Sequence, residues 1–151
     1  MLKKLIIYSS KHHGNTEKVA KAMAESINAD IMRAGDVVIN ALDAYQLIGF
    51  GSGIYGGRMD KSIIELLDKL PAYSDKKAFV FSTSGIGKDE YNDSAKQKLQ
   101  EKGFEIIGSF ACKGYDTFGP FKLVGGIAKG RPDDDDIQKA KNFVLEFIKY
   151  A

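Results

Sequence analysis

Residues Leu5–Ala20 read LIIYSSKHHGNTEKVA, an apolar run followed by a polar turn and the start of a helical pattern. The run from Leu2 to Tyr8 is rich in branched side chains, which is typical of a strand buried on both faces of a parallel sheet. From Asn15 to Ile27, apolar residues recur at helical spacing. A buried strand that passes through a short turn into an amphipathic helix predicts a fold of alternating strands and helices.

The alternation continues along the rest of the chain. Five strands and four or five helices in alternation imply right-handed crossovers and an α/β fold, a doubly wound parallel sheet. At 151 residues, the whole chain (1–151) is expected to form one domain. Further strands are expected over Asp30–Ala34, Gln46–Gly51, Lys77–Ser82 and Phe104–Cys112, further helices over Lys61–Leu70, Asn92–Lys102 and Asp133–Tyr150, and Asp36–Tyr45 has no clear pattern.

Composition excludes several classes of protein. The formal net charge of +2 is too small and too evenly spread for a nucleic-acid-binding surface. No apolar run approaches the ~18–20 residues of a membrane-spanning helix, and no signal peptide is recognised, so a cytoplasmic protein is expected. The single cysteine, Cys112, excludes an intrachain disulfide and a cysteine-cluster metal site, and we expect it to be buried and inert.

The acidic run Asp133-Asp134-Asp135-Asp136 stands where the last helix is expected to begin. One aspartate can cap the helix there, and the others favour the positive end of its dipole. A metal or partner site is the alternative interpretation of this run.

Three of the expected strands end in loops of glycine and hydroxyl residues, where ligands bind in open α/β sheets. The first loop, Ser9–Thr16, offers hydroxyls and amides at a helix N-terminus, which suit a phosphate. The second, Gly51–Arg58, holds Tyr55 among glycines, so a flat ligand can approach the backbone and stack on the ring. The third, Ser82–Gly87 followed by Tyr91, offers backbone donors and acceptors to a heterocycle. Each loop alone is also compatible with an ordinary turn, whereas the three together favour a binding site.

With these loops in this order, the chain resembles the flavodoxins over essentially its whole length. The most specific motif is Gly14-Asn15-Thr16 followed by the helix that starts Glu17-Lys18-Val19-Ala20. The resemblance implies a three-layer sandwich around a five-stranded parallel sheet of order 2-1-3-4-5. It also implies that FMN is the cofactor and that the protein is a low-potential electron carrier for redox partner proteins, rather than an enzyme in its own right. We expect no catalytic or metal-binding residue, no nucleic-acid or membrane partner, and a monomer or weak homodimer.

The resemblance assigns residues of all three loops to FMN. The first loop would hold the phosphate, and Tyr55 of the second would stack on the isoalloxazine. The peptide between Gly56 and Gly57 would reorient when flavin N5 gains a proton. The third loop would frame the pyrimidine ring, with Tyr91 either as a second stacking partner or as the start of a helix. The candidate FMN-binding residues are Ser9, Ser10, Lys11, His12, His13, Gly14, Asn15, Thr16, Ser52, Gly53, Ile54, Tyr55, Gly56, Gly57, Thr83, Ser84, Gly85, Ile86, Gly87 and Tyr91.

Three features depart from the flavodoxin pattern. Lys11-His12-His13 stands where many flavodoxins have a threonine-rich run, so these side chains either pair with the phosphate or are exposed. The chain is mildly basic, whereas typical flavodoxins are acidic. The segment from Lys113 to Pro132 is long for a connection. It is hypothesised to cover the flavin or dock the partner, with Tyr115, Phe118 or Phe121 near the site, although it could instead cover the core elsewhere.

Other functions are compatible with the same fold. An NAD(P)H-dependent FMN or quinone reductase would share the phosphate loop, and flavodoxin-domain protoporphyrinogen oxidases are similar at the first loop. A plain interaction domain without cofactor is a further alternative. A response-regulator receiver is excluded, because Ser9-Ser10 and Gly51-Ser52 stand where its aspartates are needed.

Overall fold

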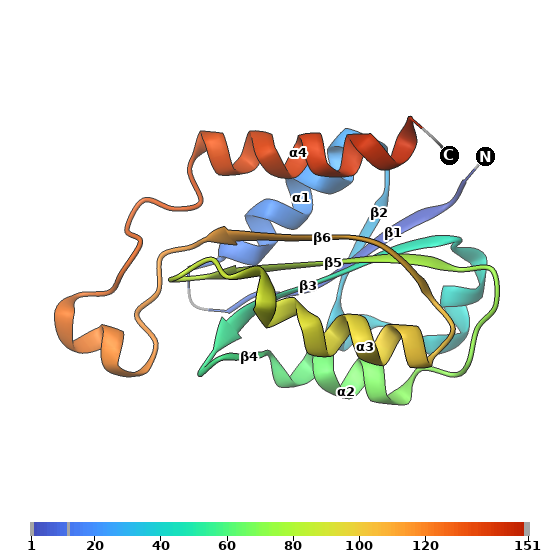
Figure 1. Cartoon of the computed structure of the whole chain (residues 1–151), viewed down its shortest axis with the longest axis horizontal. Helices are drawn as coiled ribbons and strands as arrows, with labels where there is room; N and C mark the ends of the chain where they lie inside the picture. Colours follow the sequence, from blue (N-terminus) through green and yellow to red (C-terminus); the bar gives the residue numbers. More distant parts are fainter. Residues whose placement is uncertain (1, 12, 150–151) are drawn as a thin grey trace.

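The computed structural model describes residues 2–11 and 13–149 and places them in three layers, with helices on both faces of a sheet (Figure 1). The strand order is β2-β1-β3-β5-β6, and all of these neighbours are parallel. The expected five-stranded parallel sheet is therefore confirmed, and the two-residue strand β4, antiparallel to the end of β3, is an addition. The strands are β1 (Lys4–Ser9), β2 (Asp30–Arg33), β3 (Leu47–Tyr55), β4 (Arg58–Met59), β5 (Lys77–Ser84) and β6 (Glu105–Lys113).

The helices divide between the two faces of the sheet. Helices α1 (Asn15–Ile27) and α4 (Asp134–Ile148) cover one face, and α2 (Lys61–Lys69) and α3 (Asp93–Glu101) cover the other (Figure 1). Successive strand residues point to opposite faces, so Phe79 packs into the α1/α4 core while Val80 packs into the α2/α3 core. Among the described residues, no helix is long and apolar enough to cross a membrane.

Glycines in β3 make room for phenylalanines of β5. Gly49 pairs with Phe79 and Gly51 with Phe81 in the parallel register. A Cβ added at Gly49 would lie 2.3 Å from the Phe79 ring, and one at Gly51 would lie 2.0 Å from the Phe81 ring. These glycines are required because the two rings pack directly over the neighbouring strand.

The expected strand ends are corrected at the edge that carries the loops. Strand β3 continues to Tyr55 and β5 to Ser84, so Ser52 and Gly53 are ladder residues paired with Ser82 and Thr83. The segment without a clear pattern forms two 3₁₀ helices, Ala34–Asp36 and Ile39–Ala44. A 3₁₀ turn over Asp89–Asn92 precedes α3, and another over Gly119–Val124 lies in the long segment after β6.

The acidic run begins α4 as expected. The Asp133 side chain accepts a hydrogen bond from the Asp136 amide, and the Asp136 side chain accepts one from the Asp133 amide, which completes a capping box. Asp136 also pairs with Arg131, whose hydrogen bonds hold the pKa of this buried carboxyl at about 2. Cys112 is buried, which raises the pKa of its thiol to about 12 and keeps it in the unreactive form.

A buried lysine caps the C-terminal end of the 3₁₀ helix Ile39–Ala44. The Lys76 ammonium donates to the carbonyl oxygens of Leu42 (3.0 Å) and Tyr45, and the residue is only 8% exposed. Replacing Lys76 with methionine would remove the ammonium that these carbonyls share, and the Leu42 carbonyl would keep the Tyr45 amide as its donor. The free energy of unfolding should therefore fall by about 2–3 kcal/mol. Urea denaturation of the variant and of Lys77→Met, an exposed neighbour expected to change stability by less than about 0.5 kcal/mol, measures the difference. Equal midpoints for the two variants would contradict this role of Lys76.

Candidate functional site

The carboxyl ends of β1, β3, β5 and β6 meet at one edge of the sheet. Ser9 pairs with Ser52, Ser52 with Ser82, and Thr83 with Cys112 across adjacent strands. This register brings the three loops expected to bind a ligand next to one another. It also brings in the long segment after β6, which extends beyond this edge (Figure 1).

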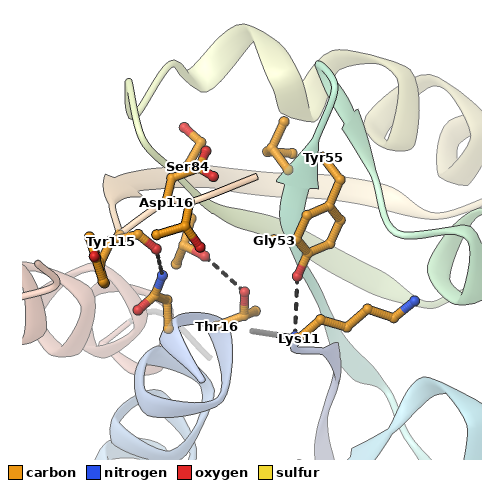
Figure 2. A pocket seen from close by; sticks show the side chains of 12 residues that line it. Lys11, Thr16, Gly53, Tyr55, Ser84, Tyr115 and Asp116 are labelled. Carbon is orange, nitrogen blue, oxygen red and sulfur yellow. Dashed lines mark hydrogen bonds between the residues drawn. The ribbon is translucent and has the colours of Figure 1, made fainter. Parts of the chain in front are cut away.

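Hydroxyl groups converge at the N-terminus of α1. The side-chain oxygens of Thr16 and Thr83 are 2.8 Å apart and buried, which joins the first loop to the end of β5 (Figure 2). The Ser10 hydroxyl accepts a hydrogen bond from the Glu17 amide (3.2 Å). Amides at a helix N-terminus lack partners within the helix and favour an anion. The two threonines line a cavity of about 20 Å³, roughly the space of one water-sized group.

Tyr55 forms the rim of this cavity. Its hydroxyl accepts a hydrogen bond from the Lys11 amide (3.2 Å), and its ring stands edge-on to that of Phe118, with centroids 5.8 Å apart. The ring folds back over Gly53, where an added Cβ would lie 2.5 Å from the Tyr55 hydroxyl (Figure 2). Burial raises the pKa of the Tyr55 phenol above its usual value. Gly53 is therefore the residue that allows the ring to lie against the strand.

Asp60 anchors the first loop from the other side. It caps α2 by accepting from the Ser62 amide, and it also accepts from the Ser9 hydroxyl (2.8 Å). The Lys11 ammonium lies 2.9 Å from the Asp60 carboxylate, so the Lys11 side chain leads away from the cavity (Figure 2). Burial alone would raise the pKa of Asp60, but the hydrogen bonds from Ser62, Lys11 and Ser9 outweigh it and hold the pKa at about 2. Asp60 is therefore a buried, ionised anchor.

The long segment after β6 is fastened to the first loop. Asn15 donates its side-chain amide to the Tyr115 carbonyl (2.8 Å), and the His13 ring lies over that of Tyr115 with centroids 4.3 Å apart. His13 Nε2 also lies 3.0 Å from the Thr117 hydroxyl. Paired backbone hydrogen bonds between Asp116 and Ile127 then close the segment on itself. The segment thus reaches the site, as hypothesised, instead of covering the core elsewhere.

A second cavity, of about 210 Å³, is lined by the β3–β4 turn, the loop after β5 and the long segment after β6. The turn has two residues, Gly56 (φ +61°) and Gly57 (φ +80°). Both positions have a left-handed backbone conformation, which glycine adopts without strain. Asp116 lines both cavities and is the carboxylate common to them. Apolar side chains complete the lining, among them Ile54, Ile86, Tyr91, Phe118 and Phe121.

A family model described as the flavodoxin domain matches residues 5–116, most of the chain. This chain belongs to the flavodoxin family. An uncharacterized protein of Methanocaldococcus jannaschii is 50% identical over 150 residues, which cover 98% of this chain and 99% of the relative. The flavodoxin-like domain-containing protein BilS of Clostridioides difficile is 30% identical over 149 residues, which cover 93% of this chain and 82% of that protein. Oxidised Flavodoxin 2 from Bacillus cereus shares the fold, with a TM-score of 0.76 over 99% of each chain at 22% identity.

Most of the residues that the flavodoxin resemblance assigns to the site lie around the two cavities. Ser9 and Ser52 instead contact Asp60, and Ser10 contacts Glu17. His12 lies outside the described residues. Gly14 and Gly87 sit in the adjoining loops with left-handed backbone, and His13 contacts the long segment. Those that line one of these two cavities are Lys11, Asn15, Thr16, Gly53, Ile54, Tyr55, Gly56, Gly57, Thr83, Ser84, Gly85, Ile86 and Tyr91.

Two acidic residues of the site were missed by the sequence analysis. Asp60 directly precedes the expected helix Lys61–Leu70, and an aspartate in that position is a recognisable cap. Its contacts with Ser9 and Lys11, however, join residues about fifty positions apart. Asp116 lies in a segment without periodicity, so no local signal marks it.

Proposed function

We propose that this protein binds FMN between the loops that follow β1, β3 and β5 and carries electrons for redox partner proteins. The observation that supports this best is the hydrogen bond between Thr16 and Thr83, because it joins two of the three loops at the N-terminus of α1. A phosphate monoester suits that place, where hydroxyl donors and helix amides converge. When bound, FMN supplies electron-transfer chemistry, and the protein supplies binding and electrostatics.

The residues around the cavities fit the two ends of this cofactor. Thr16, Thr83 and the amides at the start of α1 would hold the phosphate. Admission of a phosphate to a cavity of about 20 Å³ requires the rim to open, and Tyr55 is the rim residue that can rotate away from the Lys11 amide. The apolar lining of the larger cavity, with Tyr91 and Phe118, suits an aromatic ring system.

Polar groups near the ring cavity would then tune the cofactor. The Gly56–Gly57 turn can change its backbone conformation without a side-chain clash. Its peptide carbonyl can therefore reorient when the bound cofactor gains or loses a proton. The Asp116 carboxylate would disfavour the addition of negative charge nearby, which supports a low reduction potential.

Absorption spectroscopy tests this proposal. The purified protein is mixed with FMN, desalted, and titrated anaerobically with dithionite. If the flavin is retained and its spectrum shows a long-wavelength absorption band at half-reduction, the protein is supported as an electron carrier. Flavin reduced only in a two-electron step would contradict the carrier role and favour a reductase. Loss of all flavin on desalting, together with no heat of FMN binding by calorimetry, would overturn the cofactor assignment.

Asp116→Asn is expected to raise the midpoint potential for the second electron by about 40 mV. The substitution removes one negative charge from the lining of both cavities, and about 1 kcal/mol corresponds to this shift for a one-electron step. Asparagine keeps a side-chain oxygen that can accept from the Phe118 amide, as Asp116 does at 2.8 Å. Spectroelectrochemistry of the FMN-loaded variant measures the shift.

Asp134→Asn is the matched control, because it removes the same charge from the exposed start of α4. We expect less than about 10 mV from it, since solvent and salt screen exposed charges. An equal shift in both variants would mean that net charge, and not the position of Asp116, sets the potential.

A further inference from the structure

A cleft of about 450 Å³ lies between α2 and α3, beside the β3–β4 turn. These two helices lie next to each other on the face opposite α1 and α4 (Figure 1). The floor of the cleft is apolar and consists of Met59, Ile64, Leu67 and Ala95. Three of these side chains, Met59, Leu67 and Ala95, are buried and belong to the α2/α3 core. The volume falls within the ~300–1,000 Å³ of sites that bind small organic molecules.

Two cations border this apolar floor. Lys98 of α3 lies 2.7 Å from the Asp68 carboxylate, and both side chains are partly exposed, so this pair is weak and its ammonium can serve a second anion. Arg58 of β4 is exposed and lines the same cleft. Within residues 2–11 and 13–149, Arg58 forms no ion pair. No carboxylate of the described residues lines the cleft, so the two charged groups of its lining, Arg58 and Lys98, are both cationic.

The cleft adjoins the proposed cofactor site without being part of it. Gly57 and Tyr91 line both this cleft and the 210 Å³ cavity. A molecule in the cleft would therefore touch the turn and Tyr91, which the cavity also contacts.

We propose that this cleft binds a small organic anion, an apolar ring system that carries a carboxylate. The apolar floor takes the rings, and the guanidinium of Arg58 and the ammonium of Lys98 take the carboxylate at the mouth. An uncharged ring system of the same size binds more weakly, because it gains no attraction from the charges of Arg58 and Lys98. A highly charged ligand such as a nucleotide fits less well, because it places polar groups on the apolar floor.

Titration of isotope-labelled protein with naphthalene-2-carboxylate, followed by amide chemical shifts, tests the proposal. We expect saturable shifts centred on the amides of Gly57, Tyr91, Ala95 and Lys98. 2-Naphthalenemethanol, which has the same rings and no charge, should bind about fivefold more weakly. Arg58→Gln should abolish this preference, because Arg58 is exposed and its replacement leaves the core intact. Lys96→Gln, on the same helix but outside the lining of the cleft, is the matched control and should bind like the wild type.

Three outcomes would overturn the proposal. These are shifts that do not saturate, shifts centred on another surface, or equal affinity for the acid and the alcohol in the wild type. The measurement needs no FMN, so failure of cofactor binding leaves the result intact. Conversely, a protein that retains FMN and shows no shifts in this cleft would reject the anion site alone.

Discussion

At pH 7, the free energy of unfolding of the Asp60→Asn variant is expected to be about 2 kcal/mol lower than that of the wild type. Asp60 is 5% exposed and accepts hydrogen bonds from Ser9 and Ser62 while it pairs with Lys11. These partners lower its pKa from 3.8 to about 2. A shift of this size corresponds to about 2 kcal/mol of stabilisation by the ionised form. Asparagine keeps an acceptor oxygen but loses the charge.

The pH dependence gives the same prediction a sharper form. The folded protein binds the proton of Asp60 less readily than the unfolded chain does, because the pKa is lowered on folding. The stabilisation is therefore complete above about pH 5 and is lost as the pH falls through about 4 to 2. Asp136, with a pKa of about 2, loses its stabilisation in the same range. Acidification should thus remove the contribution of Asp60 from the wild type but not from Asp60→Asn, while both proteins lose that of Asp136.

Urea denaturation from pH 7 down to pH 2.5 measures both effects. Asp68→Asn is the matched control, because Asp68 makes an exposed ion pair with Lys98, and we expect its stability to change by less than about 1 kcal/mol. If Asp60→Asn matches the wild type in stability at pH 7 and in its loss of stability with acid, the ionised anchor contributes nothing to the fold.

The spacing of apolar residues correctly predicted those helices and strands whose conformation is set by residues near in sequence. Helix α1 has the predicted bounds, Asn15–Ile27, because its apolar spacing is regular and Gly14 precedes it in left-handed conformation. The strand ends were predicted too short. Ser52 and Gly53 have weak intrinsic preference for strands, and they are extended because neighbouring strands pair with them.

The parts that could not be predicted depend on contacts between distant residues. The segment after β6 is positioned by a hydrogen bond from Asn15 to Tyr115, one hundred positions away. The direction of the Lys11 side chain follows from Asp60, and the rim formed by Tyr55 follows from the Lys11 amide. The sequence therefore indicated which loops form the site, while the partners of each side chain required the three-dimensional structure.

Thr16→Val is expected to weaken FMN binding about thirtyfold and to leave riboflavin binding within about twofold. Thr16 is 1% exposed, and valine has nearly the same shape, so the main loss is the hydroxyl at the N-terminus of α1. A hydrogen bond to a charged group contributes about 2 kcal/mol, which corresponds to this factor. Riboflavin lacks the phosphate, so its affinity reports only on the site for the ring system.

Calorimetry with both flavins, on the wild type and the variant, separates the phosphate effect from damage to the fold. Ser26→Ala is the control, because it removes a hydroxyl from the far end of α1, where Ser26 donates to the Ala22 carbonyl. Thr83→Val should also weaken FMN selectively, and the double variant should lose less than the sum of the two, since both hydroxyls share one hydrogen bond. If riboflavin loses as much affinity as FMN, Thr16 acts on the ring cavity or on the fold, and the phosphate must bind elsewhere along this edge of the sheet.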